Sequence, residues 1–491
     1  MRILLLNPPA ENGVSEYADR TSPAERGAVE VEDFGSFPPL GLLYILSALR
    51  KKFPEHELHF LDCVAEGIRQ SDLAGRVATL DPDVVGMTSF TMSLVDVCQA
   101  ARTIRSVIPR VHLSLGGHHV IAFPVEAAEL PEFDSVVVGE GEEAFPALVE
   151  ALETGGDITT IPGVYTRDSI RTCSGRAYDD PRFLASIVVP PAYVQDIDQL
   201  PFPDRSVIRH LNYRSIVGAS DNLATMVSSR GCPCRCTYCD VPFKVYRQRA
   251  LPSVADEIRE CLELGYGEIH FYDDLFNITP ERVIAFCDEV TRRGYRFDWD
   301  FRGRVNTVTR ESLVRARAAG CRMISFGVET GSDEGLLLLK KNTTTEQVRS
   351  VFRWCRELGI LTIADFMIGL PFERSADDVR RNVDFLLSLD PDYAQFSVLS
   401  LFPHTELFAD AARRGLIAPE RWNEFARNPQ PGFWIDHWEE HLPMKELLRL
   451  QQESYRRFYL RPRYIWRSLL STCSWHEFRS KLAGALKLIQ G

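Results

Sequence analysis

The sequence Ser-Ser-Arg-Gly-Cys-Pro-Cys-Arg-Cys-Thr-Tyr-Cys-Asp, residues 228–240, follows the apolar run Ala224–Val227. It places Cys232, Cys236 and Cys239 in a C-x-x-x-C-x-x-C spacing on a loop after a predicted strand. Thiolates this close in sequence can converge on one metal centre, and soft sulfur selects zinc, copper or iron–sulfur clusters. Structural zinc usually takes two separated pairs of ligands, and no second pair follows here, which disfavours zinc. A metal-free loop is also disfavoured, because free cysteines normally disperse through cores.

This spacing, with Gly231 before it and Tyr238 inside it, resembles the signature of the radical S-adenosylmethionine enzymes. The resemblance implies that the three cysteines hold a four-iron, four-sulfur cluster. It also implies that the open iron binds the amino and carboxylate groups of S-adenosylmethionine. Cys234 lies in the wrong register for this pattern, and a slip of the register that would include it is the alternative.

Composition limits the class of protein. The 491 residues correspond to roughly three domains. A hydrophobic content of 45% and a charged content of 25% are typical of a globular chain. The net charge of −12 argues against a surface that binds nucleic acid as a whole. Asn7-Pro8-Pro9 follows the first apolar residues directly, so we expect no signal peptide and a cytoplasmic protein.

Residues 1–154 alternate short apolar runs with helical segments, which predicts an α/β domain with a doubly wound parallel sheet. The expected strands are Arg2–Leu6, Glu57–Leu61, Val84–Thr88, His112–Leu115 and Ser135–Val138, and the expected helices include Leu40–Lys52 and Val95–Val107. Ligands bind such sheets beyond the carboxyl ends of the strands. The candidate residues at these ends are Thr88, Ser89, Gly116, Gly117, His118, Gly139 and Glu140. Ordinary turns favour the same residue types, so both interpretations stay open.

The turns Pro38–Gly41 and Gly139–Glu142 resemble those of the cobalamin-binding domain of cobalamin-dependent radical S-adenosylmethionine enzymes. The resemblance implies that cobalamin binds at these strand ends. Val64 stands where many cobalamin domains carry a histidine, so we expect base-off cobalamin with no protein histidine on cobalt. For His118 and His119 we expect a polar contact to the corrin edge or exposure to solvent. A domain that has lost cobalamin is the alternative.

Prolines gather in residues 155–223, which predicts a linker with a small hairpin at Gly163–Arg176. Residues 224–401 resume the alternation and predict a partial (βα)6 barrel. Its expected strands are Ala224–Val227, Glu268–Tyr272, Phe297–Phe301, Met323–Gly327, Thr362–Ile368 and Ala394–Leu399.

Charged residues follow these strands, namely Asp273, Asp274, Arg304 and Glu329. Carboxylates and a guanidinium at one barrel mouth suit a zwitterionic nucleoside, although ion pairs at a rim are the plainer alternative. By resemblance, Tyr238 would contact adenine and the two aspartates would bind the methionine amino group. Arg304 would hold the methionine carboxylate, and Glu329 would contact the ribose.

Residues 402–491 are expected to be helical, with one helix over Glu439–Tyr459. From His441 onward there are ten Lys or Arg residues against three Asp or Glu residues. This basic amphipathic tail predicts either peripheral contact with a membrane or a solvated helical face.

The chain as a whole resembles the cobalamin-dependent radical S-adenosylmethionine family. The expected reaction is reductive cleavage of S-adenosylmethionine to a 5′-deoxyadenosyl radical, followed by C-methylation of a small molecule or lipid. The expected partner is an external one-electron reductant of the flavodoxin or ferredoxin type. The alternatives are radical cyclisation, coupling or oxidation without methyl transfer, and a corrinoid- or lipid-binding protein with vestigial catalysis. No feature of the sequence identifies the substrate.

Overall fold

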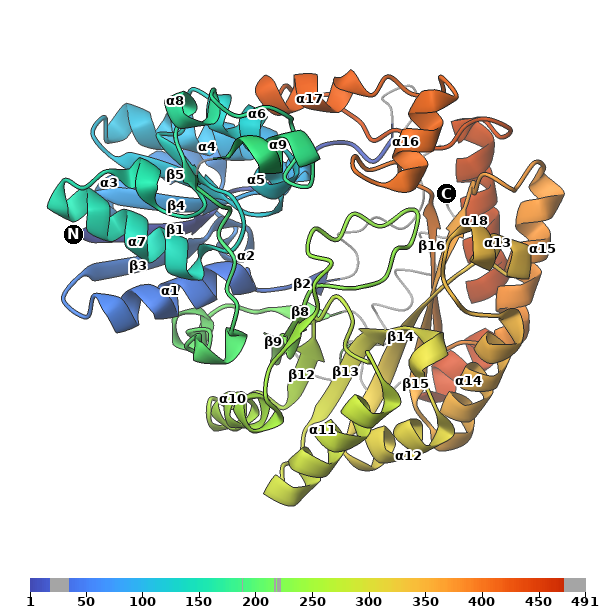
Figure 1. Ribbon diagram of the computed structural model, residues 1–491. Helices are drawn as coiled ribbons and strands as arrows, with labels where there is room; N and C mark the ends of the chain where they lie inside the picture. Colours follow the sequence, from blue (N-terminus) through green and yellow to red (C-terminus); the bar gives the residue numbers. More distant parts are fainter. Residues whose placement is uncertain (18–34, 188, 216–217, 219–221, 472–491) are drawn as a thin grey trace.

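Two six-stranded sheets organise the chain (Figure 1). The computed structural model describes residues 1–17, 35–187, 189–215, 218 and 222–471. The first sheet has the order β3-β1-β4-β5-β6-β7. Its strands are β1 (Arg2–Asn7), β3 (Glu57–Asp62), β4 (Val84–Thr88), β5 (His112–Gly116), β6 (Ser135–Val137) and β7 (Val164–Tyr165). All of its pairings are parallel except that of β6 with β7.

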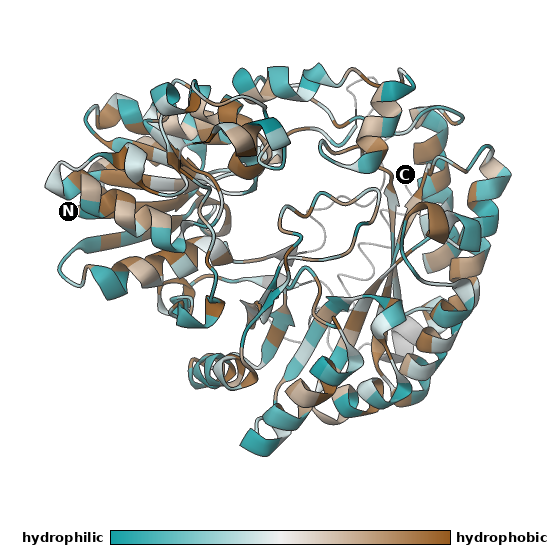
Figure 2. Ribbon diagram, viewed as in Figure 1, coloured by the Kyte–Doolittle hydropathy of each residue, from teal (hydrophilic) through white to brown (hydrophobic). Residues whose placement is uncertain are grey.

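Helices cover both faces of this sheet, as the sequence predicts. Leu4 and Leu6 of β1 pack toward α3 (Gln70–Leu80) and α4 (Leu94–Val107), whereas Ile3 and Leu5 pack toward α1 (Leu40–Lys52) and α7 (Gly141–Thr154). The central strands are therefore apolar on both faces and appear brown in Figure 2. The shorter helices are α2 (Cys63–Glu66), α5 (His118–Ala122) and α6 (Pro124–Glu129). Strand order reverses between β1 and β4, and the carboxyl ends of these strands form the ligand-binding edge in sheets of this kind.

The segment that joins the two sheets differs from the predicted hairpin. Val164–Tyr165 form β7, which extends the first sheet antiparallel to β6. Residues Arg167–Ile170 then form the short helix α8, because Thr166 and Ser169 make a reciprocal capping box. The segment continues through α9 (Pro181–Ser186) and β8 (Arg214–Ser215), which pairs with β2 (Gly35–Ser36). The predicted domain boundaries stay predictions.

The second sheet is an open parallel barrel of six strands, as predicted. Its order is β16-β15-β14-β13-β12-β9. The strands are β9 (Leu223–Met226), β12 (Glu268–Phe271), β13 (Asp298–Gly303), β14 (Cys321–Glu329), β15 (Leu361–Ile368) and β16 (Tyr393–Val398). The helices are α10 (Leu251–Glu263), α11 (Pro280–Arg293), α12 (Arg310–Ala318), α13 (Asp333–Leu338), α14 (Thr345–Leu358) and α15 (Ala376–Leu389).

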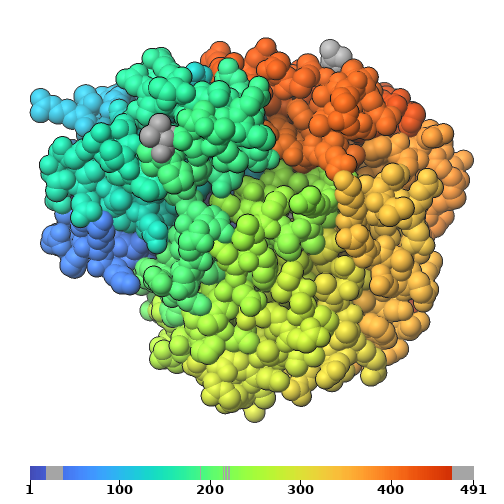
Figure 3. Space-filling view, viewed as in Figure 1, coloured from blue at the N-terminus to red at the C-terminus, as the bar shows by residue number. Residues whose placement is uncertain are grey.

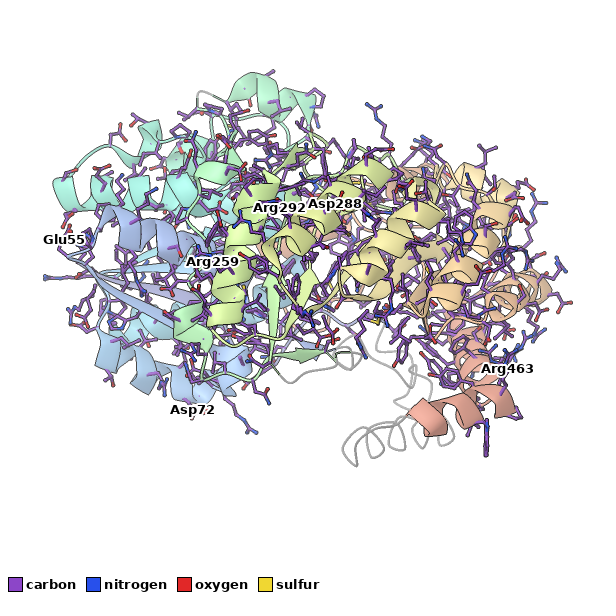
Figure 4. All side chains as sticks on the ribbon, turned by 90° about the horizontal axis from the view of Figure 1, so that it is seen from below. Glu55, Asp72, Arg259, Asp288, Arg292 and Arg463 are labelled. Carbon is purple, nitrogen blue, oxygen red and sulfur yellow. The ribbon has the colours of Figure 1, made fainter. Side chains whose placement is uncertain are left out.

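Alternation along the barrel strands separates a core from a lumen. Phe271, Trp299 and Phe301 pack with Phe276 and Phe286 between the strands and the helices. Side chains of the opposite parity, such as His270 and Asp300, face the lumen. The outer helix surfaces carry ion pairs, and Figure 4 labels Arg259, Asp288 and Arg292 on α10 and α11.

The C-terminal region begins with α16 (Glu406–Arg413) and α17 (Glu420–Arg427), drawn in orange in Figure 1. The helix predicted from Glu439 begins instead at Met444, because Pro443 is suited to the position before the first turn. This helix, α18 (Met444–Tyr459), lies along the edge strand β16. Gln451 and Tyr459 donate to Phe396 O and Ala394 O, at 2.8 and 2.9 Å, and Tyr455 Oη accepts from Phe396 N–H at 3.1 Å.

The opposite edge strand of the barrel, β9, is covered by an arginine. Arg205 donates to Thr225 O at 2.6 Å and to Glu257 at 2.6 Å, and its side chain is buried. Both edges of the open barrel are thus sealed by side chains, which prevents their pairing with another strand.

The chain ends, within the described residues, in α19 (Pro462–Ser471). Most of the predicted basic tail lies outside these residues. Among the helices that are described, none combines the length and the apolar character needed to cross a membrane.

Candidate functional site

The cysteine loop grows out of a short hairpin. β10 (Ser229–Arg230) pairs antiparallel with β11 (Arg247–Gln248), and residues 231–246 connect them. Gly231 has φ +83°, and a Cβ there would come within 2.3 Å of Val245 O. Glycine is therefore required where the loop leaves β10. Cys232 N–H donates to Phe243 O at 2.9 Å, which closes the loop on itself.

The three predicted cluster cysteines lie on this loop at the barrel mouth. Cys232 is buried and the other two are half-buried. Arg304 Nη1 donates to Cys236 Sγ at 3.2 Å, which places a positive charge beside one thiol. In the described part of the chain no three His, Cys, Asp or Glu side chains gather tightly enough to hold a single ion. Cluster cysteines bind different irons and need no such convergence, so three thiols on one loop beside a cation fit a cluster.

Cys234, which falls outside the predicted register, contacts Cys232. A hydrogen bond between the two thiols raises the pKa of Cys232 and lowers the pKa of Cys234 to about 6. The loop therefore presents a fourth sulfur at the site, and the register of the ligand set stays a prediction.

The two aspartates after β12 have different environments. Asp273 is buried, and its carboxylate accepts from Ser228 N–H at 2.8 Å and from the hydroxyls of Ser228 and Ser229. Burial raises the pKa of Asp273 to about 6. Asp274 is exposed, and Asp274 Oδ2 accepts from Gly231 N–H at 2.9 Å. Asp273 thus supports the loop from behind, and Asp274 is the carboxylate left to meet a ligand.

Tyr238 and Glu329 meet at the mouth, and a lysine that the sequence analysis did not select joins them. Tyr238 Oη donates to Glu329 Oε1 at 2.7 Å, and Lys341 Nζ donates to the same oxygen at 2.8 Å. Lys341 is buried. Two adjacent lysines predict exposure to solvent, so only the fold shows that the side chain of Lys341 points inward.

Arg304, predicted to hold a carboxylate, is already engaged on several sides. Besides Cys236, its guanidinium donates to Asn306 Oδ1 at 3.2 Å and to Lys341 O. Its backbone N–H donates to Asn277 Oδ1 at 2.9 Å. These contacts fix the guanidinium against the cysteine loop rather than leave it open.

Within the lumen, His270 and Asp300 form a pair that the sequence analysis missed. Strands β12 and β13 place the two residues side by side, and His270 Nδ1 contacts Asp300 Oδ2. The rings of Phe37 and Tyr272 flank the imidazole at centroid distances of 5.7 and 5.6 Å. Both atoms of this contact, His270 Nδ1 and Asp300 Oδ2, are buried, and neither makes a hydrogen bond to any other group among the described residues. Only the register of two strands reveals this pair.

The second candidate site lies at the carboxyl edge of the first sheet. A cavity of about 60 Å³ opens there, and its lining includes Gly86, Gly116, Gly117, Gly139 and Gly141. A Cβ on Gly117 would come within 2.6 Å of Thr88 Oγ1, whereas one on Gly116 would meet no atom nearer than 3.9 Å. Gly116 is thus bare backbone beside open space, which would admit the edge of a planar group such as a corrin, whereas Gly117 lies against β4 and Gly139 against Ala192.

Some polar residues of this edge are buried and hold the strand ends in place, whereas others face the space between the domains. Ser89 is buried, its hydroxyl donates to Phe90 O of its own loop at 2.7 Å, and its N–H donates to Gly116 O of β5 at 3.0 Å. His119 is buried, its Nδ1 lies 3.0 Å from Thr91 Oγ1, and burial lowers its pKa to about 3. His118 instead reaches the space between the domains, where it stacks on the exposed Phe90 ring and lies 3.9 Å from the Asp240 carboxylate.

Val64, used to predict the cobalt ligand, lies elsewhere. It sits on α2, behind the edge strand β3, and is not part of the cavity lining. The neighbouring Asp62 is buried and accepts from Asn7 and Tyr213 at 2.8 and 2.7 Å. The assignment of Val64 to the position of a cobalt-binding histidine stays a prediction.

Glu140, predicted to bind a cofactor, ties the two domains together instead. Its carboxylate accepts from Arg230 at 2.8 Å, from Arg247 at 2.7 Å and from Val194 N–H at 2.6 Å. Burial opposes ionisation of Glu140, but the two arginines hold its pKa below the usual value. Arg230 also donates to Glu142 at 2.6 Å. Since Arg230 immediately precedes Gly231 and Cys232, this network anchors the cysteine loop on the first domain.

A mostly parallel sheet with a glycine-rich strand edge thus lies beside an open barrel with a cysteine loop, and each domain carries one candidate site. Comparison with known proteins agrees. The B12 binding domain model matches residues 31–149, and the radical SAM superfamily model matches residues 226–386. The chain therefore carries a B12-binding domain followed by a radical S-adenosylmethionine domain, which is the domain pair of the cobalamin-dependent radical S-adenosylmethionine enzymes.

Relatives match along nearly the whole chain. An uncharacterised methyltransferase of Pyrococcus horikoshii is 28% identical over 95% of this chain and 94% of its own length. The anaerobic magnesium-protoporphyrin IX monomethyl ester cyclase of Cereibacter sphaeroides is 29% identical, over 95% of this chain and 72% of its own. The solved structure of the radical S-adenosylmethionine methyltransferase TsrM from Kitasatospora setae, with cobalamin and a [4Fe-4S] cluster bound, has the same fold. It aligns with a TM-score of 0.63 and 22% identity, over 84% of this chain and 74% of the other.

Proposed function

We propose that this enzyme cleaves S-adenosylmethionine reductively at its cysteine loop and transfers a methyl group to carbon of a small-molecule or lipid substrate. The observation that carries the proposal is the juxtaposition of the two sites. His118, at the edge of the first sheet, lies 3.9 Å from Asp240 of the cysteine loop, so both sites open on one space. When bound, the cluster supplies the electron that cleaves S-adenosylmethionine, and cobalamin supplies a carrier for the methyl group. The relative from Pyrococcus horikoshii, named a methyltransferase, supports this reaction.

The residues of the mouth would each serve the nucleoside. Asp274 offers a carboxylate to the methionine ammonium group, and Glu329 offers one to the ribose hydroxyls. Tyr238 offers its ring to adenine. Arg304 supplies positive charge beside Cys236. Because reductive cleavage consumes an electron, the proposal includes an external one-electron donor of the flavodoxin or ferredoxin type.

For cobalamin we propose base-off binding without a protein imidazole on cobalt. His119 is buried, His118 lies beside Phe90 and the Asp240 carboxylate, and neither histidine lines the cavity. Electron paramagnetic resonance of the cob(II)alamin form tests the proposal. A triplet splitting of the cobalt lines that disappears in His118→Ala would overturn it.

The barrel lumen is the proposed place for the substrate. The pair His270–Asp300, flanked by Phe37 and Tyr272, offers a polar group between aromatic walls. Such a setting suits a substrate with a planar or apolar body and a hydrogen-bonding group.

The decisive experiment uses anaerobically reconstituted protein, S-adenosylmethionine with a deuterated methyl group, and a panel of small molecules and lipids. We expect mass spectrometry to show a product that gains the deuterated methyl group. Formation of 5′-deoxyadenosine with a product that only loses hydrogen would favour cyclisation or oxidation, which the cyclase relative supports as the second candidate. If no 5′-deoxyadenosine forms, both are wrong and a binding protein with vestigial catalysis is the better description.

We also propose peripheral membrane contact through the end of the chain. Trp466 and Ile465 of α19 are exposed, and Arg463 is exposed beside them (Figure 4). Truncation after Leu460 should release the protein from anionic vesicles without changing its iron content, and high salt should do the same. Binding to vesicles that salt does not weaken, or no binding at all, contradicts this proposal.

A further inference from the structure

Lys341 is the residue at the barrel mouth for which neither the sequence pattern nor the comparisons supply a role. Its side chain is 7% exposed, and its Nζ lies 2.8 Å from Glu329 Oε1 and 3.2 Å from Tyr238 Oη. Burying an ammonium group is costly unless it is paired and hydrogen-bonded, and here both partners are residues of the proposed nucleoside site.

The backbone around Lys341 is unusual. Lys340 has φ +55° and Asn342 has φ +51°, so a non-glycine residue with left-handed backbone stands on each side of Lys341. Glu329, its partner, has φ +65°. Non-glycine residues in this region are uncommon and cluster where the surrounding structure needs an exact side-chain placement. Lys340 ends α13 in a Schellman motif, in which Lys341 N–H donates to Leu336 O and Lys340 N–H donates to Leu337 O, both at 3.0 Å, so this turn brings Lys341 to the mouth.

The packing beneath the pair supports this. A Cβ on Gly327 would come within 2.3 Å of Glu329 Oε1 and 2.9 Å of Lys341 Nζ. Gly327 therefore lets the lysine and the glutamate lie directly on strand β14. At this point the register of β14 against β15 shifts, between Gly327 and Glu329, which turns Glu329 toward the mouth.

Lys341 also connects to the cysteine loop through its backbone. Lys341 O accepts from Arg304 Nη2, and Arg304 Nη1 donates to Cys236 Sγ. Leu339 O, two residues earlier, accepts from Thr237 N–H at 3.3 Å. Residues 339–341 thus contact Glu329, Tyr238 and Arg304, together with the cysteine loop at Thr237.

We infer that Lys341 is a positioning residue of the S-adenosylmethionine site, which holds Glu329 and Tyr238 in the arrangement that receives the nucleoside. This inference rests on the proposed function. Lys341 and Tyr238 both donate to Glu329 Oε1, and the hydrogen bonds found among the described residues do not involve Glu329 Oε2. The division of labour leaves Oε2 for a ribose hydroxyl, while the positive charge of Lys341 compensates the buried carboxylate.

The test measures binding of S-adenosylmethionine to reconstituted protein by equilibrium dialysis, with iron content and thermal unfolding measured on the same samples. Lys341→Met removes the charge and keeps the length of the side chain. We expect its dissociation constant to rise about 10- to 100-fold, as for loss of a residue that orients a ligand-binding group, with iron content unchanged. Lys341→Arg should recover part of the affinity, because it keeps the charge but not the geometry.

The matched control is Lys340→Gln. Lys340 is the preceding residue, with the same left-handed backbone region, but its Nζ pairs with Glu406 at the surface. Its affinity for S-adenosylmethionine should stay within about two-fold of the wild type, as expected for an exposed pair. The double variant Lys341→Met with Glu329→Gln removes both buried charges. Compared with Lys341→Met alone, the double variant should unfold at a higher temperature, but its affinity for S-adenosylmethionine should stay low.

Several outcomes overturn the inference. Wild-type affinity in Lys341→Met would show that the lysine does not position the site. Recovery of affinity together with stability in the double variant would show a purely structural role. Loss of iron in Lys341→Met would place its role in the cysteine loop instead. Failure of iron-loaded wild-type protein to bind S-adenosylmethionine is a separate result that rejects the proposed function itself and the inference with it.

Discussion

Single residues of the mouth divide into those that hold the loop and those that face a ligand, and the adjacent pair Asp273 and Asp274 shows this division best. We predict that Asp274→Asn weakens binding of S-adenosylmethionine roughly 10- to 100-fold, equivalent to about 1.5–3 kcal/mol for a hydrogen bond to a charged group. Asp273→Asn should instead lower the free energy of unfolding by about 1–3 kcal/mol, because it disturbs a buried acceptor of three hydrogen bonds. Equilibrium dialysis and thermal unfolding of both variants give the comparison. Reversed effects would show that the two roles are exchanged.

Glu373, which follows β15, predicts a dependence of stability on pH. Burial raises its pKa to about 7, although Asn382 and the Leu370 N–H donate to it. A carboxyl whose pKa is raised on folding stabilises the folded state below its ordinary pKa, and this contribution is lost as the pH rises toward 7. The loss is on the order of 3 kcal/mol between pH 4.5 and 8.

In Glu373→Gln this contribution is absent, so the melting temperature should fall less between pH 5 and pH 8 than in the wild type. The exposed Glu420 provides the control, and Glu420→Gln should follow the wild-type curve. Parallel curves for wild type and Glu373→Gln would contradict the assignment of a raised pKa.

The sequence predicts individual residues less well than strands, for a physical reason. Buried parallel strands such as Ile3–Leu6 are apolar on both faces and stand out as continuous runs. The partner of a polar residue depends on the register between distant strands. His270–Asp300 and Glu140–Arg230 are set by such pairings, and sequence alone does not contain them in readable form. Lys341 could not be predicted, because its burial depends on the left-handed backbone of its two neighbours and no sequence motif indicates that conformation.

At the scale of elements, the contact between α18 and β16 is open to a direct test. Tyr455 Oη accepts from Phe396 N–H at 3.1 Å in a buried setting. Tyr455→Phe leaves that N–H without its partner, so we predict a loss of about 1–3 kcal/mol in the free energy of unfolding. Denaturant unfolding measures the change. A neutral effect would mean that the edge of the barrel is sealed by apolar packing rather than by hydrogen bonds.

At the scale of the whole molecule, Figure 3 shows the N-terminal domain, the green segment around the cysteine loop and the orange C-terminal region meeting in one continuous surface. Glu140 is the buried link between the first two. Breaking a buried ion pair by removing one charge costs about 3–5 kcal/mol. We predict that Glu140→Gln speeds hydrogen exchange at Ser229–Arg230 and Arg247–Gln248.

The matched control for this prediction is Glu143→Gln, because Glu143 is exposed on the same helix, α7. Its exchange should equal that of the wild type. Unchanged exchange at β10 and β11 in Glu140→Gln would show that the domains are joined chiefly by other contacts.

The open barrel has a consequence for the range of molecules that such a scaffold can admit. In a closed barrel, strand number and tilt fix the circumference. Among the described residues no strand pairing bridges the gap between β9 and β16. Separate side chains seal the two edges, Arg205 on one and Gln451, Tyr455 and Tyr459 on the other. The width of the barrel lumen is therefore set by the side chains that bridge the gap and not by the strand pairing of the sheet. Substitutions at the bridging side chains alone would therefore let related proteins admit ligands of very different size, with the rest of the barrel unchanged.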